Sequence, residues 1–292
     1  MYSCFTTFTL TMRNIPIVVL ILMLAACKRD AELPLSAIPG RIGLNNQNGE
    51  YFQYFPKTGE YFSLGSQNPA RWSHNGALLL VAGTEGGQSY NAVLDAHTLE
   101  VKLRINKQEL SGFCWSPDDR EIAYLSGNRI VRLNLETQVE YISLLPSDYE
   151  FNSEMDWSPD GTRFVLCGRN PEFYLESALC SVRADGSDYR VLAIGPFQNP
   201  RWSPDGTQIA FNDVTNIHLM KADGSNDHVI IKTAQNPCWS ADGSILMYTF
   251  IVYGDWWEEG EIHVKAREID GDQREREINY TGMALTDWSP VE

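Results

Sequence analysis

Six residues, each directly before a tryptophan of a recurring phrase, are the side chains of this sequence with the clearest capacity for joint chemistry. The phrase is Trp-Ser followed by a turn, as in RWSPDG at 201–206. In chain order the preceding residues are Arg71, Cys114, Asp156, Arg201, Cys238 and Asp287. Arginine and aspartate side chains can form ion pairs with one another or bind a polar ligand together. Because the order Arg, Cys, Asp occurs twice, a ring of these positions would have approximate two-fold symmetry.

Other catalytic chemistry finds little support in the sequence. There is no G-x-S-x-G nucleophile motif, and the five histidines lack the spacing of metal ligands. The acidic turn at 270–272 lacks the regular ligand spacing of a calcium loop. We therefore predict no enzyme and no cofactor; a calcium ion in an acidic channel has only the net charge of −15 in its favour. An enzyme whose axial active site draws histidine and aspartate from several repeats would leave no local motif, and it stays the enzymatic alternative.

The phrase recurs six times and defines the expected fold class. Its tryptophans, 37 to 49 residues apart, are Trp72, Trp115, Trp157, Trp202, Trp239 and Trp288. A period of about forty residues with strand-like runs is typical of a β-propeller, because one blade of four strands uses that much chain. Within the fourth repeat, runs rich in β-branched and aromatic residues alternate with Asp-Gly breaks, which indicates an antiparallel meander. The sequence therefore predicts an all-β, six-bladed β-propeller of four-stranded antiparallel blades.

The two ends of the chain are predicted to close the ring. Residues 284–290 supply only the first strand of a blade, whereas residues 41–64 read as strands two to four without a first. One composite blade built from both segments would remove the last open sheet edge. In every blade we assign the phrase itself to the scaffold: proline and glycine set the turn, and the tryptophan packs against the neighbouring blade.

The repeat also has a known relative. With its strands EIAY at 121–124 and QIAF at 208–211, and its ADGS turns at 184–187 and 222–225, it resembles the TolB-type, or WD40-like, β-propeller repeat. The resemblance covers about residues 41–290. It implies that the first strand of each blade is the innermost, so that the residues before the tryptophans face the channel. We expect no counterpart of the N-terminal α/β domain of TolB, so its role in envelope assembly is not carried over.

This arrangement would bring the charged residues of the ring together across blades. Asp156 would lie beside Arg201 and, across the closure, Asp287 beside Arg71, and we expect a salt bridge in each pair. Two roles stay open for these four residues. They form ion pairs that only stabilise the ring, or they form a polar site at the channel mouth that binds a ligand or ion.

The remaining cysteines raise the question of a disulfide. Cys167 ends the second strand and Cys180 begins the third strand of the third blade. A disulfide across this hairpin is one alternative, and two buried thiols are the other. Cys114 and Cys238 would lie in opposite blades, too far apart to be joined.

One loop, VYGDWWEEGE at 252–261, departs from the basic blade. We expect it on the rim of the propeller, where insertions often carry function. Exposed aromatic rings beside carboxylates suit a peptide, a sugar or a cationic partner. Packing of the aromatic rings against the edge of the blade is the alternative. The candidate rim-loop residues are Tyr253, Asp255, Trp256, Trp257 and Glu258.

The N-terminus reads as a lipoprotein signal. Residues 15–26 form an apolar run shorter than a membrane span. The run ends in LAAC at 24–27, which resembles a bacterial lipobox. We predict a signal peptide over residues 1–26, a lipidated Cys27 with a tether over residues 27–40, and a propeller over residues 41–292. An ordinary cleavage site beside an unmodified cysteine is the alternative.

Together these features predict a lipid-anchored protein of the bacterial cell envelope, at the periplasmic face of the outer membrane or at the cell surface. Its propeller would be a non-catalytic module that binds an envelope protein or peptide. The net charge of −15 argues against nucleic acid as a partner. We expect a monomer that meets the membrane only through its lipid. A propeller enzyme with an axial active site, such as a polysaccharide lyase or glycan hydrolase, and a structural scaffold of a surface complex are the alternatives.

Overall fold

The structure is a computed structural model. It describes residues 32–34, 37–38, 40–46, 48, 50–65, 68–85, 88–105, 110–151, 154–171, 177–252, 261–278 and 283–289. The predicted signal peptide and Cys27 lie outside these residues. Residues Leu33–Glu292 form one compact unit. In the described part of the chain, no helix has the length and apolar character needed to cross a membrane.

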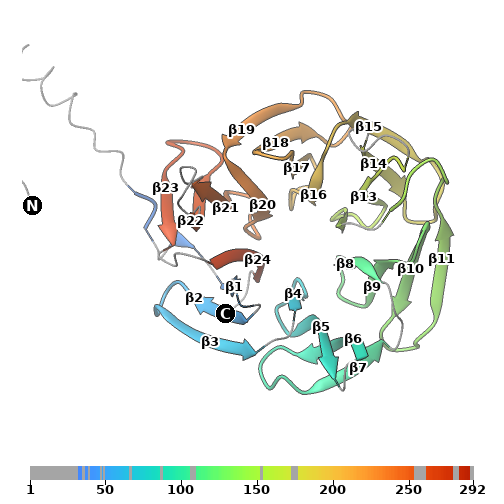
Figure 1. The fold of residues 1–292 in the computed structure, drawn as a ribbon, viewed down its shortest axis with the longest axis horizontal. Helices are drawn as coiled ribbons and strands as arrows, with labels where there is room; N and C mark the ends of the chain where they lie inside the picture. Colours follow the sequence, from blue (N-terminus) through green and yellow to red (C-terminus); the bar gives the residue numbers. More distant parts are fainter. Residues whose placement is uncertain are drawn as a thin grey trace, which may run out of the picture. The chain divides into compact units, whose positions relative to one another are not determined.

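Six four-stranded sheets are arranged in a ring (Figure 1). Blade 1 comprises β4 (Asn68–Trp72), β5 (Leu78–Glu85), β6 (Gln88–Asp95) and β7 (Val101–Ile105). Blade 2 comprises β8 (Ser111–Trp115), β9 (Glu121–Leu125), β10 (Arg129–Asn134) and β11 (Glu140–Leu144). Blade 3 comprises β12 (Met155–Trp157), β13 (Arg163–Gly168), β14 (Ala178–Arg183) and β15 (Arg190–Ile194). Blade 4 comprises β16 (Gln198–Trp202), β17 (Gln208–Asn212), β18 (Asn216–Lys221) and β19 (His228–Lys232). Blade 5 comprises β20 (Ala234–Trp239), β21 (Ile245–Val252), β22 (Glu261–Glu268) and β23 (Glu275–Ile278).

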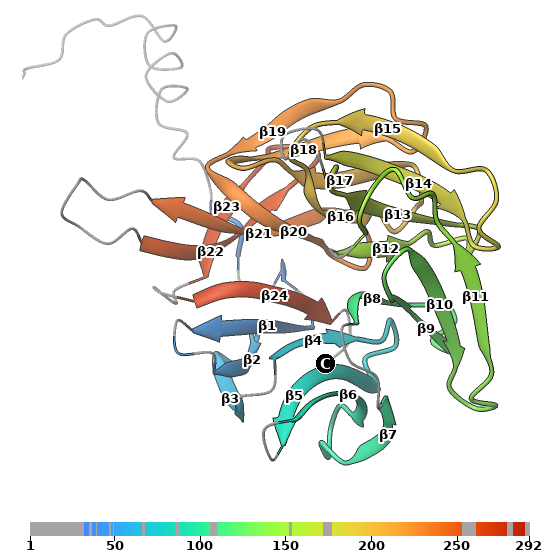
Figure 2. The same cartoon turned by 45° about the vertical axis from the view of Figure 1, so that its right-hand side comes forward.

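Blade 6 is the composite blade, and it confirms the predicted closure of the ring. It comprises β24 (Met283–Ser289), β1 (Arg41–Asn46), β2 (Tyr51–Phe55) and β3 (Glu60–Gly65), in that spatial order. The C-terminal strand β24 pairs antiparallel with β1, and Trp288 lies opposite Ile42. Figure 2 shows the two strands side by side. The all-β, six-bladed architecture is therefore confirmed, and the two ends of the chain pair with each other within one four-stranded blade.

The apolar core lies between neighbouring blades. Trp115 at the end of β8 packs with Leu80 and Val93 of blade 1 and with Ile122 of its own blade. Burial of one large aromatic or aliphatic side chain stabilises a fold by about 1.5–3 kcal/mol. The predicted packing of the tryptophan against the adjacent blade is thus confirmed here. The core also extends into the predicted tether, because Leu33 and Ile38 are fully buried against the composite blade.

In blades 1 to 5 the phrase after the tryptophan forms a closed turn that leads into the second strand. In blade 4 the Ser203 hydroxyl donates to Asp205 Oδ1 at 2.6 Å and accepts from the backbone N–H of Gln208 at 2.9 Å. Gly206 has a φ of 71°, a left-handed conformation that glycine adopts without strain. Because the same serine contacts recur at Ser116, Ser158 and Ser240, the phrase is a scaffold element, as predicted.

Blade 2 departs from this rule at one position. Asp119 stands where most of the other turns have glycine, and it has a φ of 58°. Its carboxylate accepts the backbone N–H groups of His74 at 2.7 Å and Asn75 at 2.9 Å. These contacts join the turns of blades 1 and 2 and compensate for the strain of a non-glycine residue in this conformation.

Candidate functional site

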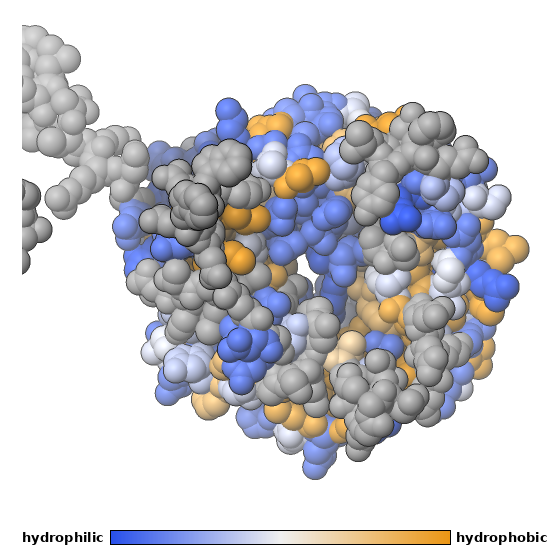
Figure 3. Space-filling model, viewed as in Figure 1, coloured by the Kyte–Doolittle hydropathy of each residue, from blue (hydrophilic) through white to orange (hydrophobic). Residues whose placement is uncertain are grey.

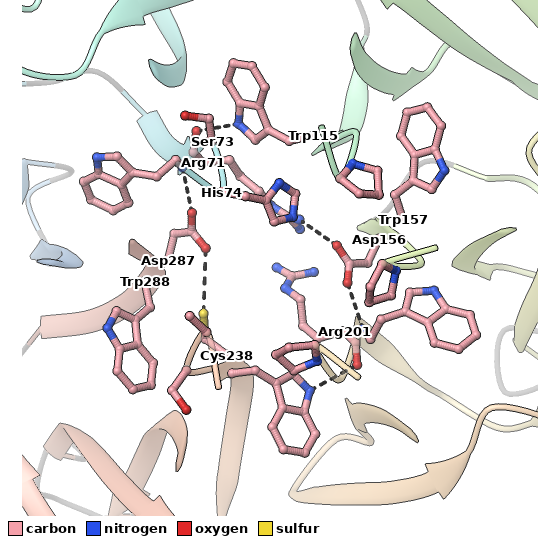
Figure 4. Close-up of a pocket in the computed structure, with 18 residues that line it drawn as sticks. Arg71, Ser73, His74, Trp115, Asp156, Trp157, Arg201, Cys238, Asp287 and Trp288 are labelled. Atoms are coloured by element: carbon pink, nitrogen blue, oxygen red, sulfur yellow. Dashed lines mark hydrogen bonds and ion pairs between the residues drawn. The ribbon is translucent and has the colours of Figure 1, made fainter. Parts of the chain in front are cut away.

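A cavity of about 350 Å³ lies at the end of the channel where the six innermost strands finish. Every blade contributes its tryptophan, and blades 1 to 5 also contribute a residue of the turn that follows it. Figure 3 shows the hollow at the centre of the ring, bordered in part by hydrophilic residues. The charged residues among its lining are Arg71, Asp156, Arg201 and Asp287. The structure therefore brings together the four channel residues that the sequence singled out (Figure 4).

The two aspartates bind the backbone of the following blade. Asp156 accepts the N–H of Trp202 at 2.8 Å, and Asp287 accepts the N–H of Trp72 at 2.8 Å. An innermost strand is a sheet edge, so N–H groups that face the channel have no partner within the ladder. The expected salt bridges Asp156 with Arg201 and Asp287 with Arg71 are wrong. Each aspartate reaches the predicted blade but contacts the N–H of the residue after the arginine.

The arginines instead converge on a residue that the sequence reasoning missed. Arg71 Nη2 lies 2.5 Å and Arg201 Nη2 lies 3.3 Å from the same oxygen, Oε2 of Glu154. Arg71 Nη1 also lies 3.5 Å from Asp156 Oδ1. Glu154 is the only charged residue at its position among the six repeats, three residues before the tryptophan. That departure from the repeat was the signal that could have found it.

The pKa values of the carboxylates Glu154 and Asp287 are shifted in opposite directions. Burial would raise the pKa of Glu154, but the charges and hydrogen bonds of Arg71 and Arg201 outweigh it and hold the pKa below its ordinary value. Burial also raises the pKa of Asp287, and here the arginine charges and the N–H groups offset only part of the effect. Asp287 has no cation within 4.0 Å among the described residues. Glu154 is thus ion-paired, whereas Asp287 is held by neutral donors.

This difference predicts the acid sensitivity of the ring. Because Glu154 has a lower pKa in the folded state than in the unfolded state, its charge stabilises the propeller above the unfolded-state pKa. The contribution is lost as the pH falls through the folded-state pKa. We expect Glu154→Gln to be less stable than the parent near neutral pH and to lose less stability on acidification. Urea unfolding at about pH 7 and about pH 4 measures this. Equal losses in both proteins would contradict the assignment.

One histidine reaches the cavity. His74 stands in blade 1 at a position where blades 2 to 4 have proline and blade 5 has alanine, and its Nδ1 lies 3.0 Å from Asp119 Oδ1. Burial lowers the pKa of His74, but the hydrogen bond and charge of Asp119, with the charges of Asp156 and Asp287, raise it overall. The carboxylates around His74 therefore favour its protonated form. No group of three or more histidine, cysteine or acidic side chains suited to a metal ion occurs among the described residues.

The cysteines of the channel and of blade 3 are free thiols. Cys238 donates to Asp287 Oδ1 at 3.7 Å, and Cys114 is buried beside the arginines. In blade 3, Cys167 lies opposite Leu179 and Cys180 lies opposite Leu166. Neighbouring residues of a strand face opposite sides of the sheet, so Cys167 and Cys180 enter different inter-blade cores. The alternative of a Cys167–Cys180 disulfide is wrong, and both are buried thiols.

Alkylation tests these thiols directly. In denaturant, we expect Cys114, Cys167, Cys180 and Cys238 all to react with iodoacetamide without prior reduction, because none is oxidised in the fold. The mass of the alkylated protein should be the same with and without reductant. Two further alkylations that appear only after reduction would contradict the free-thiol assignment.

Some predicted residues cannot be compared with the structure. The candidate rim-loop residues at 253–258 and the predicted lipidation site Cys27 lie outside the described residues. Their roles stay predictions.

Comparison with known proteins bears on the fold. No family model matches the sequence. A putative Tricorn-like protease C-terminal subunit from Sulfurisphaera tokodaii is 27% identical over 172 residues, which are 58% of this chain and 19% of that protein. The match thus spans about a fifth of the length of this curated relative.

Solved structures share the architecture more extensively. TolB from Acinetobacter baumannii superposes with a TM-score of 0.66 at 15% identity, covering 86% of this chain and 67% of that one. A putative TolB from Agrobacterium tumefaciens gives 0.64 at 18% identity, covering 87% and 95%. An oligogalacturonate lyase in complex with manganese gives 0.55 at 17% identity, covering 82% and 72%. At these identities the likeness concerns the fold: the chain is a six-bladed β-propeller with the architecture found in TolB.

Proposed function

We propose that this chain is a non-catalytic binding module of the cell envelope that holds a segment of a protein or peptide partner in the channel cavity. One observation carries the proposal: all six blades line a cavity of about 350 Å³, and four of them bring the charged side chains of Arg71, Asp156, Arg201 and Asp287 to it. Its carboxylates already accept backbone N–H groups or face arginine, so none is left as a poised general base. Concave sites with a few convergent polar groups are typical ligand sites. The fold likeness to TolB agrees with a binding role.

Site-specific photocrosslinking in the native envelope tests the proposal. A benzoyl-phenylalanine replaces Ala241, which lines the cavity, or Leu144, which is 71% exposed on the outer strand β11. We expect a discrete crosslinked partner from position 241 and none from position 144. A synthetic peptide from the crosslinked region of the partner should compete. Equal crosslinking from both positions, or none from 241, would refute the channel as the binding site.

Membrane attachment is proposed at Cys27 through a thioether-linked diacylglycerol. The supporting observation is the apolar run ending in LAAC at 24–27. Metabolic labelling with an alkyne fatty acid should mark the wild-type protein, and Cys27→Ala should abolish both the label and membrane fractionation. Labelling that persists in C27A would exclude this anchor.

A catalytic function is the second candidate, favoured by the His74–Asp119 pair at the cavity mouth and by the fold likeness to an oligogalacturonate lyase. A histidine oriented by a carboxylate can act as a general base. Incubation with oligogalacturonate, followed by absorbance of the unsaturated product, tests this candidate. Product formation that disappears in His74→Gln would establish it and displace the non-catalytic proposal.

A further inference from the structure

The two halves of the channel ring are chemically unequal, although the repeat makes them equivalent in sequence. Arg71 faces two carboxylates, Glu154 and Asp156. Arg201 is its counterpart three blades away. Within the described part of the chain, Arg201 forms one ion pair, to the Glu154 oxygen that lies closer to Arg71. Its Nη1 turns to the carbonyl of the neighbouring Pro200 at 3.0 Å. Arg201 is therefore the arginine whose charge is less compensated.

Asp287 is the matching acid in the other half. By the two-fold relation it would pair with Arg201 as Asp156 pairs with Arg71, yet no such ion pair forms within 4.0 Å. Asp287 is 9% exposed, and its side-chain oxygens meet the N–H of Trp72 and the thiol of Cys238. A carboxylate so deeply buried normally faces a cation. Asp287, by contrast, has no such partner among the residues that the structure describes.

Arg201 and Asp287, whose charges are the less compensated ones of the ring, line the same part of the cavity. Arg201 comes from blade 4 and Asp287 from blade 6, and the small uncharged side chain of Cys238 in blade 5 lies between them. In Figure 4, open space separates the guanidinium of Arg201 from the carboxylate of Asp287, whereas Arg71 and Asp156 lie together on the other side. The half of the cavity between Arg201 and Asp287 thus offers N–H donors on one wall and a carboxylate acceptor on the other.

We propose that the half-cavity between Arg201 and Asp287 is a carboxamide subsite, which takes an amide of a partner peptide with its C=O toward Arg201 and its N–H toward Asp287. The inference rests on the proposed peptide-binding function and deepens it. An amide is neutral and is both donor and acceptor, so it satisfies both walls at once. A carboxylate in its place would be repelled by Asp287, and an ammonium by Arg201. The amide comes from the peptide backbone or from an Asn or Gln side chain.

Four small probes of defined chemistry separate these possibilities. They are N-acetylalanine methylamide, which has backbone amides only, and the corresponding derivatives of glutamine, glutamate and lysine. Binding is followed by NMR through the indole N–H of Trp239, which donates to the carbonyl of Arg201 at 3.3 Å. We expect saturable binding of the neutral probes, about tenfold tighter than that of the charged probes. Stronger binding of the glutamine derivative assigns the subsite to a side-chain amide, and equal binding to the backbone.

Substitutions locate the subsite in one half of the ring. Arg201→Met and Asp287→Asn should each weaken binding of the best neutral probe by about tenfold. Asparagine keeps an acceptor for the Trp72 N–H, so D287N tests the site even where R201M unfolds. The matched comparison is Asp156→Asn, the equivalent change in the opposite half of the same cavity, which should weaken binding clearly less than D287N. Thermal unfolding verifies that each variant is folded.

Several outcomes would overturn the carboxamide subsite. These are tighter binding of the glutamate or lysine probe, equal losses in D156N and D287N, and absence of saturable binding by any probe. The photocrosslinking result is independent of all three. A partner captured at position 241 with probe binding insensitive to R201M and D287N would retain the proposed function and refute this inference alone.

Discussion

Arg71→Met will lower the free energy of unfolding by about 3 kcal/mol, the largest effect we expect from a single substitution in the ring. The Arg71 side chain is 13% exposed and faces Glu154 at 2.5 Å and Asp156 at 3.5 Å. Removal of one partner from a buried ion pair leaves the other charge desolvated without compensation, which typically costs 3–5 kcal/mol. We place the effect at the lower end because Glu154 is 40% exposed and water screens part of it. Urea unfolding at neutral pH measures the loss.

The two-fold counterpart is the control for this prediction. Arg201→Met removes one ion-pair contact, at 3.3 Å to an oxygen that Arg71 already holds, and a hydrogen bond to the Pro200 carbonyl. It should therefore cost clearly less than Arg71→Met. The double variant Arg71→Met with Glu154→Gln should recover part of the loss, because an amide in place of the carboxylate leaves no buried charge there. If the two arginine variants are equally destabilised, the inequality between the halves of the ring is refuted.

The fold could be predicted from the sequence because the same sequence pattern recurs in each blade. Six copies of a phrase at about forty residues specify six blades, since each copy sets the same strand, turn and packing position. The composite blade followed from the same reasoning. A first strand at residues 284–290 and three strands at residues 41–64 each leave a sheet edge that the other satisfies.

The sequence predicted which residues form the site better than it predicted the contacts among them. The sequence placed the arginines and aspartates in one ring, but the direction of each side chain depends on local backbone geometry. In β4 and β16 the pairing register shifts just before the arginine, between Asn68 and Arg71 and between Gln198 and Arg201. The N–H of the tryptophan after each arginine donates to the aspartate of the preceding blade. That aspartate does not pair with the arginine, whose side chain extends toward Glu154 instead. A charge pattern alone does not determine which of these contacts forms.

The blade 3 cysteines illustrate a second limit. Cys167 and Cys180 bracket one hairpin and look well placed for a disulfide in the sequence. The observed register sets Cys167 opposite Leu179, one residue from Cys180, and a shift of one residue moves a side chain to the other face of the sheet. Because a shift of one residue in that register leaves the sequence spacing unchanged, the spacing could not decide between a disulfide and two thiols.

A chain that stops after Gly282 will not fold cooperatively, because it lacks the inner strand of the composite blade. Strand β24 pairs with β1 along its length and buries Leu285 and Trp288 to 4% and 5% exposure. Loss of one such side chain typically costs 2–5 kcal/mol, and the whole stability of a domain is about 5–15 kcal/mol. The truncation also removes Asp287, the acceptor for the Trp72 N–H in blade 1. Both blades that meet at the closure are therefore damaged. Thermal circular dichroism should show a broad, non-cooperative transition, and addition of a synthetic peptide of residues 283–292 should restore a sharp one. A truncated chain that melts like the parent would mean that five blades and three strands suffice, and that closure by β24 contributes little to stability.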